Sequence, residues 1–170
     1  MFSAIYKFND LFILALCLIS VFSCDHGLKP LEEKSSQMSG ISGTISYLNW
    51  PPAENLYDLR LVVFKRYPPG DIFEELGAGR AYVYPAIGEE SLPFFEDTTV
   101  YIMELDTGYY EYVTVAQQYG ENIFEDWLAA GQYDTLFTDE LPTSITVLSG
   151  QILDDINIQV DFDNLPPQPF

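Results

Sequence analysis

Residues 156–162, with the sequence INIQVDF, give the clearest indication of how this chain folds. Apolar and polar residues alternate along the whole stretch: Ile156, Ile158, Val160 and Phe162 against Asn157, Gln159 and Asp161. Successive side chains of a β-strand point to opposite faces of the sheet. The pattern therefore predicts a strand with one buried face and one solvated face.

Six further stretches show strand-like patterns rich in aromatic and β-branched residues. They are ISGTISYL at 41–48, YDLRLVVFKRY at 57–67, RAYVYPAI at 80–87, TVYIMEL at 99–105, YYEYVTVAQQY at 109–119 and SITVLS at 144–149. Proline and glycine turn signals separate them, as in Trp50-Pro51-Pro52, Pro68-Pro69-Gly70 and Ser149-Gly150. About seven short strands of this kind predict an all-β fold, an antiparallel β-sandwich.

The stretch at 57–67 differs from the others because it is apolar on both faces at its centre. Leu59, Leu61 and Val63 fall on one face of a strand, and Val62 and Phe64 on the other. We therefore expect this strand to lie inside a sheet rather than at its edge.

One segment, ENIFEDWLAAGQY at 121–133, carries a helical pattern instead. Asn122 is a plausible N-cap, and Glu125 stands three residues later, as in a capping box. The apolar residues share one helical stripe: Ile123, Phe124, Trp127 and Leu128. Gly131 suits a helix C-terminus. The pattern predicts one short helix that lies as a lid across one end of the sandwich.

Together, ISGTISY, LYDLRLVVFK and LDTGYYEYVTVA resemble the carboxypeptidase-regulatory-like and transthyretin-like domains. Those sandwiches often open with an Ile/Val-x-Gly-x-Ile/Val strand, which ISGTISY matches through Gly43. They also carry a Gly-x-Tyr turn late in the domain, which Gly108-Tyr109-Tyr110 matches. The resemblance implies an accessory, structural or binding module. The hydrolytic members depend on histidines and a C-terminal Tyr-Arg-Gly-Ser motif. Residues 41–163 contain no histidine and the chain lacks the motif, so no hydrolytic activity is implied.

The N-terminus predicts export. Residues 11–22, LFILALCLISVF, form an apolar run of 12, shorter than the roughly 20 that a membrane-spanning helix needs, so it fits the core of a signal peptide. The residues at the end of this run, Val21-Phe22-Ser23-Cys24, resemble the lipobox of bacterial lipoproteins. In that family the cysteine is acylated and becomes the new N-terminus, which implies lipid attachment at Cys24. An ordinary secretory signal cleaved near Ser23, or a retained anchor helix, is the alternative.

We accordingly expect four parts: a signal peptide at 1–23, a lipidated flexible tether at 24–40, the β-sandwich at 41–163 and a C-terminal tail at 164–170. Lys7 and Asp10 leave with the leader, so the mature net charge stays at the −19 of the whole chain. A surface this acidic repels phosphate backbones and excludes nucleic acid as a partner.

Little in the composition predicts chemistry. The only histidine, His26, lies in the tether, where no scaffold orients it. We therefore expect no catalytic residue, no metal and no cofactor. Calcium is the metal alternative, because acidic residues gather near the last strand: Asp154, Asp155, Asp161, Asp163 and Asn164. Their spacing does not match a calcium loop.

The sequence thus predicts a non-catalytic, lipid-anchored β-sandwich outside the cytoplasm, a binding or structural module of a bacterial envelope, with the outer membrane or cell surface as its expected location. Its partners are the membrane, through the lipid, and a protein or glycan. A glycan-binding accessory lipoprotein and a small carboxylate-dependent hydrolase are the alternatives. Trp50, in a turn, and Trp127, on the predicted lid, are candidate ligand platforms. Both rings could instead cap the ends of the sandwich.

Overall fold

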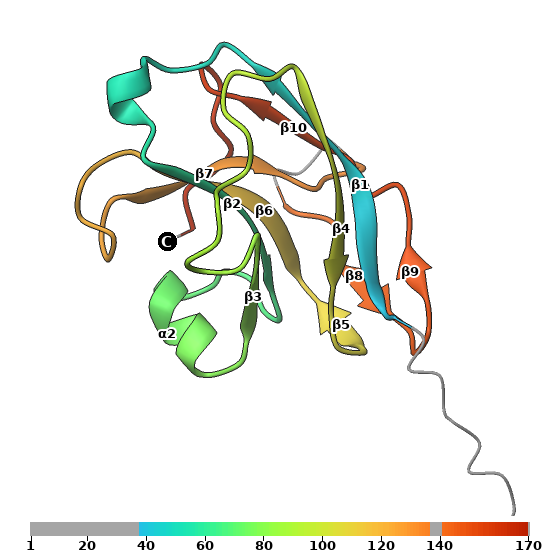
Figure 1. The fold of residues 1–170 in the computed structure, drawn as a ribbon. Coiled ribbons are helices and arrows are strands. Elements are labelled where there is room, and N and C mark those ends of the chain that lie inside the picture. The colour runs from blue at the N-terminus through green and yellow to red at the C-terminus, as the bar shows by residue number, and fades with distance from the viewer. Residues whose placement is uncertain (1–37, 137–140, 170) are drawn as a thin grey trace, which may run out of the picture. The chain divides into compact units, whose positions relative to one another are not determined.

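The computed structural model describes residues 38–136 and 141–169, and these belong to one compact unit, Ser36–Phe170. Strands dominate this part of the chain (Figure 1). They are β1 Gly40–Leu48, β2 Asp58–Phe64, β3 Ala81–Tyr84, β4 Thr98–Glu104, β5 Gly108–Tyr110, β6 Tyr112–Gln118, β7 Trp127–Gln132, β8 Ile145–Val147, β9 Ile152–Leu153 and β10 Ile158–Asp161. A 3-10 turn, η1 Ala53–Asn55, and a helix, α2 Ile72–Gly77, interrupt them.

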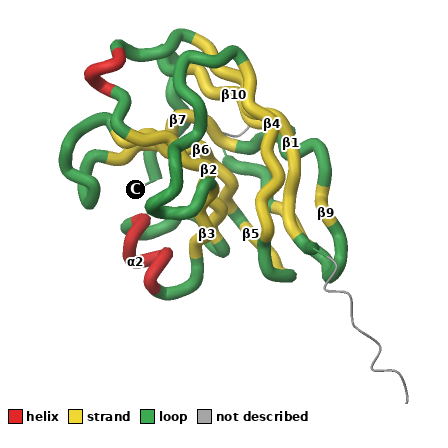
Figure 2. The backbone as a smooth tube through the Cα atoms, in the orientation of Figure 1, coloured by secondary structure: helices red, strands yellow, loops and turns green. Residues whose placement is uncertain are grey.

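Most strands join one sheet in the order β3-β2-β6-β7-β10-β1-β4, with β9 beside β1. β1 runs parallel to β9 and β10, and its pairing with β4 is antiparallel, as are the remaining pairings. β5 and β8 form a separate two-stranded ribbon. The large sheet curls into a half-barrel, so that β2 and β6 lie across from β1 and β4 (Figures 1 and 2).

The predicted all-β class is confirmed, and each of the seven strand-like stretches contains a strand. The alternation at the C-terminus is also confirmed, because Ile156, Ile158 and Val160 are buried while Asn157 and Gln159 are exposed. The separation into two antiparallel sheets is not confirmed, since one curled sheet of mixed direction carries most strands.

The interior position predicted for residues 57–67 is confirmed, because β2 lies between β3 and β6. Leu59, Leu61 and Val63 face the main core on the concave side of the sheet, together with the buried residues of β1, β4 and β10. Val62 and Phe64 face a second, smaller core on the convex side. Fully burying each such side chain is worth about 1.5–3 kcal/mol, so β2 stabilises both layers.

The helix predicted over residues 122–131 is wrong. Asn122 does organise one turn, since its side-chain oxygen accepts from the Phe124 N–H and its carbonyl from the Glu125 N–H. The chain then becomes β7, which fills the space between β6 and β10. Pairing on both sides satisfies its backbone in a way that a helix could not, and Trp127 therefore starts a strand rather than sitting on a lid.

The α-helix of the described residues is α2, which no sequence pattern predicted. The Asp71 carboxylate caps it by accepting from the Glu74 N–H at 2.9 Å. With six residues it is too short to show a helical period.

The predicted signal peptide, Cys24 and most of the predicted tether lie outside the described residues. Within residues 38–136 and 141–169, no helix is both long and apolar enough to cross a membrane. At the other end, the side chain of Gln168 accepts from the Ala129 N–H and donates to its carbonyl, which ties the C-terminal segment to β7.

Gly43, the glycine of the ISGTISY motif, lies where the segment that links β9 to β10 packs closely against β1. A Cβ built on Gly43 would lie 2.2 Å from the carbonyl oxygen of Ile156. That same oxygen accepts from the Tyr101 hydroxyl at 2.6 Å, and the Ile156 N–H donates to the Ser42 carbonyl. Neither segment can move away without breaking these bonds, so this close approach requires glycine.

We therefore expect Gly43→Ala to lower the free energy of unfolding by about 3 kcal/mol, the upper end of the usual cost of overpacking. Urea melts followed by circular dichroism measure it. Gly108→Ala is the matched control, because a Cβ there meets only Tyr110 side-chain atoms at 3.8 Å or more. Equal stability losses in the two variants would contradict the requirement for glycine at position 43.

Candidate functional site

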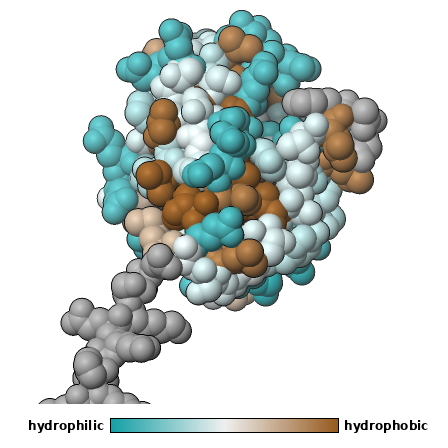
Figure 3. Space-filling model, turned by 90° about the vertical axis from the view of Figure 1, so that its right-hand side faces the viewer, coloured by the Kyte–Doolittle hydropathy of each residue, from teal (hydrophilic) through white to brown (hydrophobic). Residues whose placement is uncertain are grey.

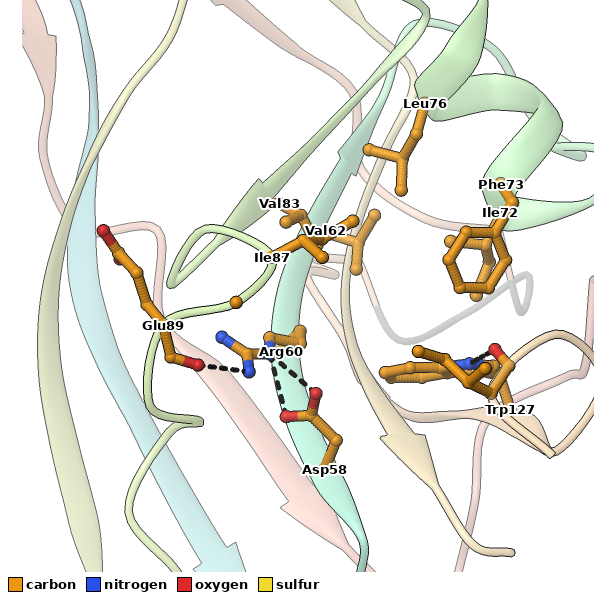
Figure 4. A pocket seen from close by; sticks show the side chains of 12 residues that line it. Asp58, Arg60, Val62, Ile72, Phe73, Leu76, Val83, Ile87, Glu89 and Trp127 are labelled. Atoms are coloured by element: carbon orange, nitrogen blue, oxygen red, sulfur yellow. Dashed lines mark hydrogen bonds and ion pairs between the residues drawn. The ribbon is translucent and has the colours of Figure 1, made fainter. Parts of the chain in front are cut away.

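A cavity of about 260 Å³ opens on the convex side of the sheet, between α2, the loop after β3 and the start of β7 (Figure 4). We call it the convex pocket. Its lining is mostly apolar and comes from six segments: Asp58, Arg60, Val62, Ile72, Phe73, Leu76, Val83, Ile87, Gly88, Glu89, Ile123 and Trp127.

The floor of the convex pocket is sheet. Val62 of β2 and Val83 of β3 project from neighbouring strands, where they pair directly. The Trp127 ring forms a side wall, and its Nε1–H donates to the Ile123 carbonyl at 2.6 Å. With its one polar group satisfied in this way, the indole presents apolar surface to the cavity.

The opposite wall is α2, which is held by an ion-pair network around the buried carboxylate of Glu75. The Glu75 carboxylate is inaccessible to solvent. It accepts from the Arg80 guanidinium at 2.7 and 3.0 Å and also pairs with Arg66. Hydrogen bonds from Arg80 and then Arg66 outweigh the effect of burial and lower the pKa of Glu75 to about 2.

The third wall is the loop after β3, which Arg60 fastens to the sheet. Its Nε–H bonds the Asp58 carboxylate at 2.8–3.0 Å. Its remaining N–H groups donate to backbone carbonyls of the loop at 2.8–3.3 Å: Pro85, Ala86, Glu89 and Glu90. Because every guanidinium nitrogen is engaged, Arg60 positions the loop rather than offering a free cation to a ligand.

Exposed apolar side chains surround the mouth of the convex pocket. Ile87 is 62% exposed, Ile123 45% and Phe124 65%. The Phe124 ring contacts Phe73 of α2, with centroids 5.2 Å apart. Single exposed apolar residues are ordinary, but a contiguous set around a cavity indicates a binding surface. Acidic side chains stand close by in sequence and are exposed: Glu74, Glu89, Glu90, Glu121 and Glu125.

The two tryptophans proposed as platforms have different surroundings. Trp127 lines the convex pocket, as described above. Trp50 lies in an aromatic cluster, with ring centroids 4.7 Å from Tyr47, 4.8 Å from Phe162 and 5.4 Å from Phe95, and its Nε1–H donates to the Glu96 carbonyl. These neighbours cover much of the Trp50 ring.

Two of the residues weighed as calcium ligands, Asp154 and Asp161, are engaged with β1 and its flanking turn. Asp154 accepts from the Ser42 hydroxyl at 2.5 Å, and Asp161 accepts from the Asn49 side chain at 2.8 Å. Within the described ranges, no group of three or more His, Cys, Asp or Glu side chains is arranged to hold a metal ion.

A second, more polar groove of about 670 Å³ runs along the outer face of β7 and β10. Amide and carboxylate side chains line it, including Gln132, Asn157 and Gln159, and residues 165–167 of the C-terminal segment form its other wall.

Comparison with known proteins gives no further guide: no protein family, curated protein or solved structure matches this chain.

Sequence reasoning missed most of the convex pocket. Two signals were present: an arginine in the middle of an otherwise apolar strand, LRLVVF, and the Asp71-x-x-Glu74 pair that opens α2. Neither signal reveals that α2, the β3 loop and β7 converge, because that depends on how the sheet curls.

The Glu75 network makes stability depend on pH in a defined window. A carboxyl with a lowered folded pKa stabilises the fold fully above its ordinary value of 4.5, and this contribution is lost as the pH falls towards about 2. We expect the stability gap between wild type and Glu75→Gln to be widest at neutral pH and to shrink across that window. Urea melts at several pH values measure it.

Glu74→Gln removes a charge from the same helix without removing a hydrogen bond of the Glu75 network, and so controls for net charge. A wild-type to Glu75→Gln gap that stays constant from neutral pH to pH 2.5 would contradict the assignment.

Proposed function

We propose that this protein is a non-catalytic, lipid-anchored binding module of a bacterial envelope, and that it docks an apolar anchor residue of a protein partner in the convex pocket. The observation that carries the proposal is the pocket itself: a preformed apolar cavity with an exposed apolar rim. Small sites of this kind, which bury one large side chain of the partner, dominate the energetics of many interfaces.

The walls of the convex pocket support a rigid site. Arg60 fixes the loop, Glu75 fixes α2 and the Ile123 carbonyl fixes the Trp127 ring. A ligand would therefore pay little to order the site on binding, which favours affinity at a small contact area.

Charge indicates the class of partner. The chain carries −19 overall, and exposed glutamates stand near the rim. An apolar anchor flanked by Lys or Arg would complement this surface, and its association would be faster at low salt.

The membrane part of the proposal depends on Val21-Phe22-Ser23-Cys24. Cys24 would carry the lipid at the start of the predicted tether, residues 24–40. One acyl chain binds marginally and two or more bind firmly, so a diacylated cysteine would be a lasting anchor.

Glu75, the buried carboxyl behind the convex pocket, is not suited to act as a catalytic acid. A hydrolase built on carboxylates needs one with a raised pKa in a cleft. The buried carboxyl of the convex pocket's wall has a lowered pKa instead, and two arginines occupy it.

We also propose the finer fold assignment, a transthyretin-like sandwich. The curl sets the two halves of the sheet against one core, and Tyr84 of β3 reaches to within 6.5 Å of Tyr101 of β4, centroid to centroid. Such domains serve as accessory modules, which agrees with a binding role.

A glycan-binding role is the second candidate, and the polar groove along β7 and β10 favours it. Its amide and carboxylate side chains could hydrogen-bond sugar hydroxyls. No aromatic residue is among those lining the groove, so a stacking platform would have to come from elsewhere.

The convex pocket can be tested with Nile red, a neutral dye that fluoresces in apolar sites. We expect wild type to bind it and the double variant Ile87→Ser, Ile123→Ser to bind about tenfold more weakly, a loss of about 1.4 kcal/mol. Fluorescence titration measures the dissociation constants. Leu136→Ser, at a residue 63% exposed and outside the pocket, is the matched control. Unchanged affinity in the pocket variant would refute the site.

The anchor has its own test. Changing Cys24 to Ala removes the thiol that would be acylated, so we expect loss of labelling by a clickable fatty acid and loss from the membrane fraction. Immunoblots of fractions washed with alkaline carbonate measure the second effect. If Cys24→Ala stays in the membrane after washing, the lipoprotein assignment is wrong, whatever the dye titration shows.

A further inference from the structure

The large sheet ends on one side at β4, and the outer edge of this strand has no partner among the described residues. The Leu105 N–H donates to the Ser39 carbonyl, and the Tyr47 N–H donates to the Asp97 carbonyl. Both bonds join odd-numbered residues of the β1–β4 register. In an antiparallel ladder, the even-numbered residues between them direct their N–H and C=O groups away from β1. The free edge therefore belongs to Thr98, Val100, Ile102 and Glu104.

The side chains of the same four residues point away from the main core. Val100 is 78% exposed and Ile102 57%, although both are strongly apolar. Figure 3 looks at the right-hand side of the view in Figure 1 and shows an apolar patch on that face. On the neighbouring strand β1, Ser42 pairs with Ile102 and Thr44 pairs with Val100. These small side chains leave the two apolar side chains uncovered.

The two edges of the sheet are unlike. At the opposite edge, β3 has four residues, and Pro85 follows it immediately. Short strands and proline are the usual protection against unwanted pairing. β4 has seven residues, TTVYIME, with no proline, no lysine and one charge, at its end. A long, flat, apolar edge is a template for adding a strand.

We propose that β4 pairs antiparallel with β4 of a second copy of this chain and so continues the sheet across a two-fold axis. Even-numbered residues must face even-numbered residues, because they hold the free backbone groups. The axis at Tyr101 satisfies this condition and sets Val100 opposite the second copy's Ile102. It also sets Thr98 opposite the second copy's Glu104, so that the charge meets a hydroxyl.

The number of apolar pairs selects this register over its neighbours. Moving the axis to Ile102 would set Ile102 against the second copy's Ile102 and Val100 against its Glu104, which leaves one apolar pair. Moving it to Val100 would set Ile102 against the second copy's Thr98. The axis at Tyr101 is the one that forms two apolar cross-strand pairs, each worth up to about 1 kcal/mol, with no like charges opposed within the strand.

The negative charge of the chain allows an experiment to distinguish pairing between two copies from pairing with a different protein. Two units of net charge −19 repel one another, and salt screens that repulsion within about 10 Å at 0.1 M. Pairing of two copies should therefore strengthen as NaCl rises. Pairing with a basic strand from another protein should instead weaken as NaCl rises.

Sedimentation velocity of the full chain in mild detergent tests the association. We expect a concentration-dependent dimer that is stronger at high salt, and loss of that dimer in Ile102→Lys without a fall in melting temperature. Leu136→Lys, an equally exposed apolar position elsewhere, should still dimerise. A monomer at every salt and concentration, or a dimer that Ile102→Lys leaves intact, would overturn the proposal. So would a complex that salt weakens.

Cross-linking in membranes tests the register without detergent. Chains with Val100→Cys and chains with Ile102→Cys, co-expressed with different tags, should cross-link to each other with a short bifunctional thiol reagent at least several-fold more than either does to itself. The chain with no added cysteine controls for links through Cys24. Equal cross-linking in all pairings would exclude the axis at Tyr101.

Discussion

The fold depends on a strand that is buried on both sides. β2 is an interior strand whose odd residues fill the concave core and whose even residues form the floor of the convex layer. The neighbouring strand β6 is buried along its whole length for the same reason. Without the convex layer, Val62 and Phe64 would face water, so α2 and the loop after β3 are required by the composition of β2. The convex pocket is the gap between these coverings.

The few cations of the chain are used to hold those coverings in place. Arg60 binds the loop, and Arg66 and Arg80 bind Glu75 of α2, so three of the seven Lys and Arg residues act within one layer. Each of these ion pairs has one buried member, Arg60 or Glu75, so a pair is costly to break from the other side, since removing the partner leaves a buried charge uncompensated. A consequence is that the outer surface keeps almost all of its negative charge. Any partner meets an acidic surface interrupted by apolar patches.

Much of the fold could be predicted from the sequence because the strands carry a clear period of two. Leu59 to Phe64 were correctly assigned to two faces, and Ile156, Ile158 and Val160 to one. The helix at 122–131 failed for a physical reason: the Asn122 capping turn is real, but its signal covers only one turn. Gly131 is needed for close approach to β10, where a Cβ would lie 2.6 Å from the Gln159 carbonyl oxygen, and not for ending a helix. The pocket could not be predicted, because its lining joins residues from 58 to 127 and the curl of the sheet alone brings them together.

A curled sheet has one concave face, which fills with apolar side chains, and one convex face, which must be covered or solvated. Among the described residues, the convex face is covered over β2, β3 and β6, where Val62, Phe64 and Tyr112 need it, whereas no described helix lies over β1 and β4. Over β1 this face is polar and half-exposed, with Ser42, Thr44 and Ser46, as solvation requires. Val100 and Ile102 on β4 break that rule. Within the described residues of one chain, neither side chain is buried in the core, so the fold does not require them to be apolar. A strand added to the free edge would pair with both.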